Sequence, residues 1–197
     1  MKHDLPADFA FAAEMVAIGA SAGGVDALLA LFDGLAPPLR ASVVIVLHLP
    51  EGQESRLVDV FGMRLRLPVE EARPHGPVEP GRIYFAPPGY HLLVEADRSF
   101  SLSCDPPVLF SRPSIDVLFE SCAEAIGDGL AAMLLTGANE DGAEGLARIH
   151  AAGGLTAVQD PDEAAHATMP AAGLRLAEPD FVLPLAGLRA LLHTVVR

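Results

Sequence analysis

Short apolar runs alternate with helix-like stretches along most of this 197-residue chain, and this alternation limits the folds that it can adopt. The predicted strands cover residues 14–20, 42–49, 130–137 and 155–160. The predicted helices, in which apolar residues recur at helical spacing, cover residues 24–36, 115–129, 142–154 and 185–196. Strand and helix in turn at this spacing indicate βαβ units. We therefore expect a doubly wound α/β fold, with a mainly parallel sheet and helices on both of its faces.

The middle of the chain, about residues 68–113, departs from this rhythm because it is rich in proline and glycine. Two short strands, 83–86 and 91–95, are predicted there, with a Pro-Gly turn between them. We expect a small antiparallel β insertion on the α/β core. The predicted organisation is an N-terminal extension over residues 1–14, followed by a single domain over residues 15–197.

Charge and hydropathy argue against several classes of function. The net charge of −13 repels a phosphate backbone, so we expect no nucleic-acid binding. No apolar run reaches the ~20 residues that a membrane-spanning helix needs. The N-terminal stretch, MKHDLPADFAFAAEM, carries acidic residues and a proline where a signal peptide would need an apolar core. We therefore expect a cytoplasmic protein that does not insert into a membrane.

The residues that commonly bind metal ions show no ligand-like spacing. Cys104 and Cys122 are the only cysteines and do not form a CxxC pair, so packing is the expected role of both. The histidines other than His48 contain no HxxxH or HxH pair. We expect no metal site.

Three predicted strands lead into a polar residue at their carboxyl ends. Ser21 follows the first strand, His48 lies at the end of the second, and Asp141 lies in the loop after the strand over 130–137. Parallel strands place their carboxyl ends at one edge of the sheet, where ligands and catalytic groups of doubly wound folds gather. Serine, histidine and aspartate are the residues of a serine hydrolase triad. In such a triad the imidazole takes the proton of the attacking hydroxyl, and the carboxylate orients the imidazole.

The glycines around Ser21 fit a nucleophile elbow, in which small residues let the chain turn sharply from strand to helix. The N-terminus of the following helix would then present backbone N–H groups to an oxyanion. Other interpretations stay open at this point. Ser21 and Asp141 each precede a predicted helix and fit the role of an N-cap, and His48 fits the polar end of a core strand. Asp160 also follows an apolar strand, and it competes with Asp141 for the role of the carboxylate.

A phosphate-binding loop is a further alternative for the stretch GASAGG. Its glycines, at positions 19, 23 and 24, match neither G-x-G-x-x-G nor a Walker loop. His48 also stands where a nucleotide-binding fold would have an acidic partner for the ribose. Nucleotide binding is therefore the weakest of these interpretations.

Seven ordered motifs between about Val16 and Leu192 carry a resemblance to a known family. They read IGASAGG, VIVLHLP, PGRIYFAPPGYHLLVE, SRPSIDVLFESCAEAIG, LLTGANEDGAEGL, GGLTAVQDP and ATMPAAG. The chain resembles the methylesterase domain of bacterial chemotaxis, the CheB family of protein-glutamate methylesterases. The resemblance implies a serine-type esterase that needs no cofactor and hydrolyses glutamate methyl esters on the cytoplasmic helices of chemoreceptors, releasing methanol. It also implies that glutamine can be deamidated, and that other chemosensory signalling proteins are partners.

The resemblance also implies a role for particular residues. It makes Ser21 the nucleophile, His48 the base and acid, and Asp141, rather than Asp160, the orienting carboxylate. It places in the oxyanion or substrate loop the residues Ala22, Ala138 and Met169.

Four positions depart from the family pattern. Ala22 stands where the family usually has threonine, and Ser111 where many members have histidine. Ala138 and Asn139 stand in the loop that commonly reads G-M-G-x-D-G. We expect an active esterase with an altered rate or specificity. The alternative is a weakened or repurposed relative that acts as a binding partner in a signalling complex.

Two further expectations concern regulation and docking. Only about 14 residues precede the first predicted strand, so we expect no receiver domain within this chain. An acidic receptor substrate would need a cationic surface on this acidic protein. The candidate contacts are Arg56, Arg64, Arg66 and Arg112.

Overall fold

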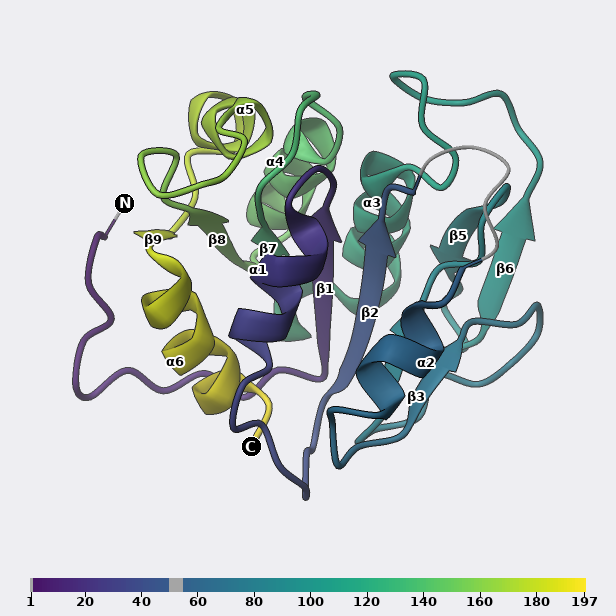
Figure 1. The fold of residues 1–197 in the computed structure, drawn as a ribbon, viewed down its shortest axis with the longest axis horizontal. Helices are drawn as coiled ribbons and strands as arrows, with labels where there is room; N and C mark the ends of the chain where they lie inside the picture. Colours follow the sequence, from purple (N-terminus) through teal and green to yellow (C-terminus); the bar gives the residue numbers. More distant parts are fainter. Residues whose placement is uncertain (1, 50–54) are drawn as a thin grey trace.

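Seven parallel strands form a central sheet in the computed structural model, which describes residues 2–49 and 55–197 (Figure 1). Their order across the sheet is β3-β4-β2-β1-β7-β8-β9. The strands are β1 (Met15–Ala20), β2 (Ser42–Leu47), β3 (Val69–Glu71), β4 (Ile83–Phe85), β7 (Leu130–Leu134), β8 (Leu155–Gln159) and β9 (Phe181–Leu183). From β1 the chain first adds strands on one side (β2, β4, β3) and then on the other (β7, β8, β9), and this change of side makes the sheet doubly wound. The predicted fold class is confirmed.

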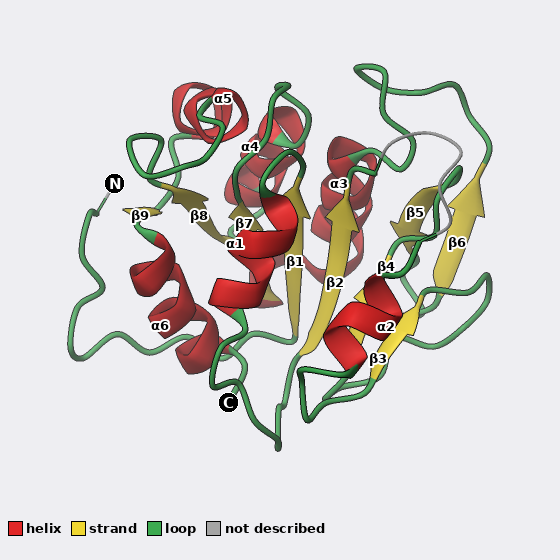
Figure 2. Cartoon of the chain, in the orientation of Figure 1, coloured by secondary structure: helices red, strands yellow, loops and turns green. Residues whose placement is uncertain are grey.

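Helices cover both faces of this sheet (Figure 2). Helices α1 (Gly24–Leu31), α2 (Leu57–Gly62) and α6 (Leu185–Val195) lie on one face. The other face carries α3 (Ile115–Ile126), α4 (Ala143–Ala151) and α5 (Thr168–Ala177), with a short 3₁₀ turn, η1 (Gly127–Gly129), after α3. Within the described residues, no helix is both long enough and apolar enough to cross a membrane.

The central strands are apolar on both sides because each side meets a helical layer. Every residue of β1, β2 and β7 is buried. Along β1, Val16 and Ile18 belong to the core beneath α1 and α6, whereas Met15 and Ala17 belong to the core beneath α3 and α4. This double burial explains the flat hydrophobicity of these strands.

The proline-rich middle contains a two-stranded antiparallel sheet, formed by β5 (His91–Val94) and β6 (Phe100–Ser103). The sequence predicted that residues 83–86 and 91–95 pair across the Pro-Gly turn, and this pairing is wrong. β4 instead joins the central sheet, parallel to β2 and β3. All three residues of β4 are buried, so its place is decided by contact with the core and not by the turn that follows it.

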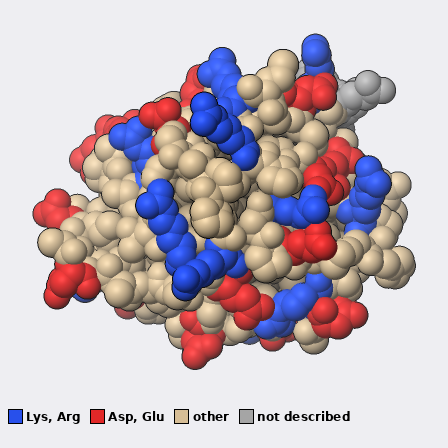
Figure 3. Space-filling model, turned by 90° about the horizontal axis from the view of Figure 1, so that it is seen from below, with Lys and Arg blue, Asp and Glu red and all other residues tan. Residues whose placement is uncertain are grey.

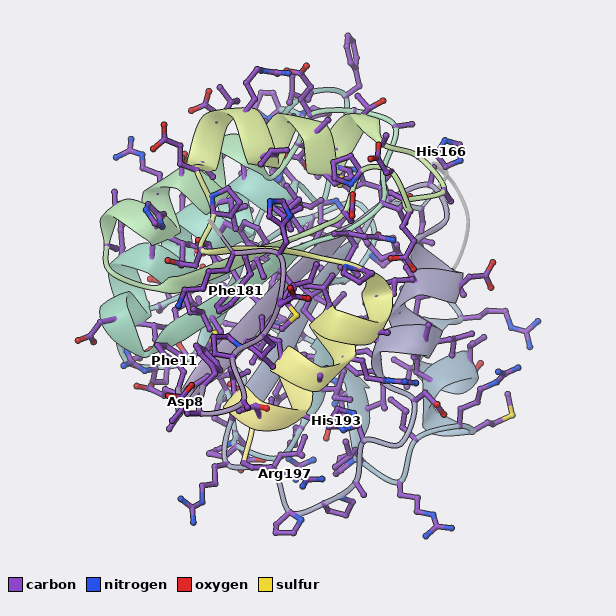
Figure 4. The ribbon with its side chains drawn as sticks, turned by 90° about the vertical axis from the view of Figure 1, so that its left-hand side faces the viewer. Asp8, Phe11, His166, Phe181, His193 and Arg197 are labelled. Carbon is purple, nitrogen blue, oxygen red and sulfur yellow. The ribbon has the colours of Figure 1, made fainter. Side chains whose placement is uncertain are left out.

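The segment before β1 packs along β9 and α6. The N–H of Lys2 donates to the carbonyl of Asp180 at 2.8 Å, and the N–H of Val182 donates to the carbonyl of Lys2 at 2.9 Å. The ring of Phe9 meets that of Phe181 edge-on at 5.3 Å. Figure 4 shows this side of the molecule, with Asp8 and Phe11 beside α6. Met1, the first residue of the predicted extension, lies outside the described residues.

The face at the amino ends of the strands mixes both signs of charge, as Figure 3 shows from below. Arg82 pairs there with Glu70 and Glu79, the latter at 2.7 Å. Arg64 and Arg66 line a hollow of about 370 Å³ together with residues at the carboxyl end of α1. Because α1 begins at the carboxyl edge of the sheet, its far end places these two arginines away from that edge.

Candidate active site

The strand register brings Ser21 and His48 to one edge of the sheet. Ala20 of β1 pairs with Leu47 of β2, and Gly19 pairs with Leu134 of β7, so the three strands end together. Ser21 and His48 line a shared cavity of about 500 Å³ at this edge. Its other walls come from the loop after β7 and from the loop before α3.

A hydrogen bond links His48 to Asp141. The Nε2 atom of His48 lies 2.8 Å from the Oδ2 atom of Asp141, and the two side chains are 11% and 0% exposed. A carboxylate can only accept, so Nε2 carries the proton of a neutral imidazole and Nδ1 is left with its lone pair. The imidazole is thereby fixed with its basic nitrogen toward the cavity.

The carboxylate of Asp141 is held at the N-terminus of α3. Its Oδ2 also accepts from the N–H of Ile115 at 2.7 Å. Its Oδ1 accepts from the hydroxyl of Ser114 at 2.8 Å and from the N–H of Asp116 at 3.1 Å. Burial raises the pKa of Asp141, but the hydrogen bond from His48 and those from the α3 N–H groups outweigh it, and the pKa falls below its ordinary value. The group is therefore an anion beside His48.

A second carboxyl group, that of Asp116, lies in the same buried region. Its Oδ1 accepts from the N–H of Gly145 at 2.7 Å. Burial is the main cause that raises the pKa of Asp116, and the nearby charge of Asp141 adds to it, so that the pKa reaches about 7. Two carboxylates at such close quarters repel each other, and the structure keeps the charge on the one that faces His48.

The turn after β1 covers residues 21–23 and leads directly into α1. The N–H of Ser21 donates to the carbonyl of Thr136 at 2.9 Å, and the N–H of Gly24 donates to the carbonyl of Ser21 at 2.8 Å. Gly23 has a φ of 78°, a left-handed value that glycine adopts without strain.

The two N-cap alternatives are wrong. Gly23 is the N-cap of α1 and Gly142 that of α4, and neither helix has a side-chain cap. Ser21 therefore does not cap α1. Asp141 accepts from the first N–H groups of α3, which lies far from it in the sequence, and does not cap the helix that follows it.

Close packing around Ile115 brings α3 near enough to serve Asp141. A Cβ at Gly19 would lie 2.4 Å from the Cγ2 atom of Ile115, and one at Gly142 would lie 2.6 Å from the same atom. Only glycine leaves room for this side chain at both positions. The first turn of α3 thus rests directly on β1 and on the loop that carries Asp141.

The three residues predicted for the oxyanion or substrate loop, Ala22, Ala138 and Met169, occupy two different environments. Ala22 and Ala138 line the cavity beside Ser21. In the described chain, the N–H groups of Ala22 and Ala138 have no backbone acceptor. Met169 is fully buried and packs behind the loop, where a Cβ at Gly137 would lie 2.6 Å from its Sδ atom. Its part in substrate binding stays a prediction.

Sequence reasoning missed a polar chain on the other side of His48. The hydroxyl of Ser111 lies 3.3 Å from the Nδ1 atom of His48, and the Nδ2 atom of Asn139 donates to that hydroxyl at 3.3 Å. Asn139 Oδ1 in turn accepts from the N–H of Asp141 at 3.3 Å. Ser21 and His48 form no hydrogen bond with each other in the described residues. Ser111 and Asn139 stood out only as departures from a family pattern, which did not indicate contact with His48.

The remaining candidates, Asp160, Arg112 and Arg56, are not among the described residues that line the cavity. The Oδ1 atom of Asp160 accepts from the N–H of Asp162 at 3.0 Å, within its own turn. The Nη1 atom of Arg112 donates to the carbonyls of Cys104 and Asp105, both at 3.1 Å, and Arg56 is exposed at the start of α2. Across residues 2–49 and 55–197, no three side chains of the types that bind metals come together.

The carboxyl edge of this doubly wound α/β sheet gathers a serine, a histidine and an aspartate, the residue types of a serine hydrolase triad. The family model described as CheB methylesterase matches residues 16–192, and the chain belongs to this family.

Relatives and a solved structure agree with this membership. A Leptospira interrogans protein is 41% identical over 87% of this chain and 89% of its own length. A Hahella chejuensis protein, named protein-glutamate methylesterase/protein-glutamine glutaminase 1, is 42% identical over 92% of this chain and 51% of its own. The crystal structure of the Thermotoga maritima CheB methylesterase catalytic domain superposes with a TM-score of 0.87. It is 28% identical, and the match covers 92% of this chain and 98% of that one.

Proposed function

We propose that this chain is a serine-type methylesterase of the cytoplasm, which hydrolyses glutamate methyl esters on chemoreceptor-like signalling proteins and releases methanol. The observation that carries the proposal is the 2.8 Å hydrogen bond from His48 to the buried Asp141, in the cavity that Ser21 also lines. The names of the relatives support the same activity. They do not favour the alternative of a weakened or repurposed relative that acts as a binding partner in a signalling complex.

In the first half of the reaction, Ser21 is the nucleophile and His48 the base. Asp141 accepts a hydrogen bond from the Nε2–H group of His48, so the Nδ1 atom is free to act as the base. Nδ1 takes the proton of the Ser21 hydroxyl as the Ser21 oxygen attacks the ester carbonyl. Nδ1 faces Ser111 in the structure, and this contact gives way to Ser21 when the substrate binds. Catalytic hydrogen bonds commonly tighten only in the complex with substrate.

The oxyanion of the tetrahedral intermediate is held by backbone N–H groups. Ala22 and Ala138 both line the cavity, and their N–H groups have no backbone acceptor in the described residues. Removing one such donor typically costs ~10²–10³ in kcat. The intermediate then expels methanol, which takes the proton from His48. A water molecule, deprotonated by the same imidazole, cleaves the glutamyl ester of Ser21 and leaves a free carboxylate. Glutamine would react in the same way, with ammonia as the leaving group.

The test is methanol release from a methylated receptor fragment. We expect release by the wild-type protein, loss in Ser21→Ala, and wild-type rates in Ser101→Ala, a matched change in β6 where the hydroxyl bonds to Glu95. A serine-directed fluorophosphonate should label Ser21 and leave the Ser21→Ala protein unlabelled. Equal methanol release by wild type and Ser21→Ala would refute the assignment of the nucleophile.

A further inference from the structure

A tight turn at the mouth of the cavity carries two large apolar side chains at its tip. Val108 and Ser111 bond to each other in both directions, with N–H to carbonyl distances of 3.1 and 2.8 Å. Between them, Leu109 and Phe110 have φ values of 46° and 64°. Two left-handed central residues are the mark of a type I′ turn, which favours Asn-Gly. Leucine and phenylalanine are strained in this conformation.

Both side chains also face solvent. Leu109 is 47% exposed and Phe110 is 102% exposed. The loop that carries them, between β6 and α3, rises above the carboxyl edge of the sheet (Figure 1). An exposed phenylalanine contributes nothing to the core, and a strained backbone lowers stability. Folding therefore gives no reason for this pair of residues at this turn.

The turn is tied directly to the catalytic groups. Leu109 and Phe110 line the cavity that holds Ser21 and His48. The Nδ2 atom of Asn139 donates to the carbonyl of Leu109 at 3.4 Å, and Ser111 at the end of the turn contacts His48. The backbone of the turn is thus tied to the residues around His48.

We propose that Leu109 and Phe110 are substrate-anchoring residues, which pack against an apolar side chain on the substrate helix beside the glutamate methyl ester. This inference rests on the proposed function, because it places a protein helix over the cavity. A residue three or four positions from the modified glutamate lies on the same face of a helix, within reach of the turn.

Charge favours an apolar anchor over an ionic one. The chain has a net charge of −13, and the described residues that line the cavity include no Asp, Glu, Lys or Arg, so the site itself offers no ionic contact to the substrate. The cavity rim continues the apolar surface of the turn, since Leu49, Ala22 and Ala138 also line it. A neutral methyl ester suits this lining, whereas the carboxylate product does not, and hydrolysis itself thereby favours release.

The test compares a protein substrate with a small one. The variants are Phe110→Ala, the double change Leu109→Asn with Phe110→Gly, and Met63→Ala as a control. Met63 is apolar and 80% exposed, and it lies just after α2, outside the cavity. Each is assayed for kcat/KM on a methylated receptor fragment and on p-nitrophenyl acetate, and thermal unfolding is followed in parallel.

We expect Phe110→Ala to lower kcat/KM on the receptor fragment by about tenfold or more, as truncation of an aromatic anchor at an interface does. On the small ester the loss should stay below about threefold, since no anchor is used there. The double variant should show the same selective loss with a raised Tm, because Asn-Gly relieves the turn. Met63→Ala should match the wild type on both substrates.

Other results would overturn the inference. If Phe110→Ala keeps the wild-type kcat/KM on the receptor fragment, the anchoring role is refuted, while the proposed esterase activity still stands. An equal fall on both substrates would mean that the turn shapes the catalytic groups and binds no helix. If the wild-type protein itself releases no methanol, the proposed function fails, and this inference fails with it.

Discussion

Replacing Asp141 with asparagine should weaken both catalysis and stability, because an amide cannot serve all the donors that the carboxylate serves. The carboxylate accepts from His48, Ser114, Ile115 and Asp116. Whichever way the amide is turned, its NH₂ group meets one side-chain donor and one backbone donor. The Ser114 hydroxyl can rotate and the imidazole can change tautomer, but a backbone N–H cannot move away.

The cost follows from that one backbone donor and from the lost charge. A buried donor without a partner costs ~1–3 kcal/mol, and hydrogen bonds to a charged group contribute more than neutral ones. We therefore expect the free energy of unfolding of Asp141→Asn to fall by about 2–4 kcal/mol at pH 7. Loss of the orienting carboxylate in Ser-His-Asp enzymes lowers kcat by ~10⁴, and a fall of ~10³–10⁴ is expected here.

The stability difference should depend on pH in a defined direction. The pKa of Asp141 is lower in the folded protein than in the unfolded chain, so the folded state binds fewer protons. Its contribution is full above the unfolded pKa of ~3.9 and is lost as pH falls through the lower, folded value. The gap between wild type and Asp141→Asn should therefore narrow below about pH 4.

Urea unfolding at pH 7 and at pH 3, together with methanol release, measures both effects. Asp160→Asn is the matched control, since Asp160 is the rival carboxylate in the sequence and, among the described residues, its side chain bonds only within its own turn. The reasoning is refuted if Asp141→Asn keeps a rate within tenfold of the wild type, or if Asp160→Asn is the variant that loses activity.

Three further outcomes are expected. Asp116→Asn should be more stable than the wild type above pH 7 and lose that advantage toward pH 4. The folded wild-type protein holds the Asp116 proton up to about pH 7, so the wild-type free energy of unfolding falls as pH rises through this window. A pH-independent difference in denaturant midpoint between the two proteins would contradict this. Gly142→Ala should lower the free energy of unfolding by about 2–5 kcal/mol, since φ is 92° and the new Cβ would lie 2.6 Å from Ile115, and an unchanged midpoint would count against the packing described. Dialysis against EDTA should leave methanol release unchanged, as the described residues contain no metal-binding cluster, and a loss restored by a divalent cation would contradict it.

The sheet and its carboxyl edge could be predicted from local sequence patterns. Strands buried on both faces are apolar throughout, and helices repeat apolar residues at their own spacing, so β1, β2, β7 and β8 and the helices α1, α3, α4 and α6 could be recognised from their own residues. The strands β3, β6 and β9 and the helices α2 and α5 were not predicted. The parallel order then brings Ser21, His48 and the loop of Asp141 to one edge. This step needs only strand direction and no knowledge of side-chain contacts.

Pairing between elements could not be predicted in this way. Residues 83–86 and 91–95 looked like a hairpin because a turn lies between them, yet β4 pairs with β2 and β3 in the central sheet. The strand that pairs with β5 is β6, in which apolar residues and serines alternate, and no prediction included this strand. Burial against the core outweighs the preference of a local turn.

The sequence by itself determined the main strands and helices of the parallel sheet and the polar residues that follow the strands, because both depend on near neighbours along the chain. Only the tertiary structure decided which carboxylate faces His48, since that bond joins residues 93 positions apart. The position of Asp141 depends on Ile115 packing over Gly19 and Gly142, because this packing brings the N–H groups of α3 to the carboxylate. The contact of Ser111 with His48 and the exposed, strained turn of Leu109 and Phe110 were likewise decided by packing between distant segments.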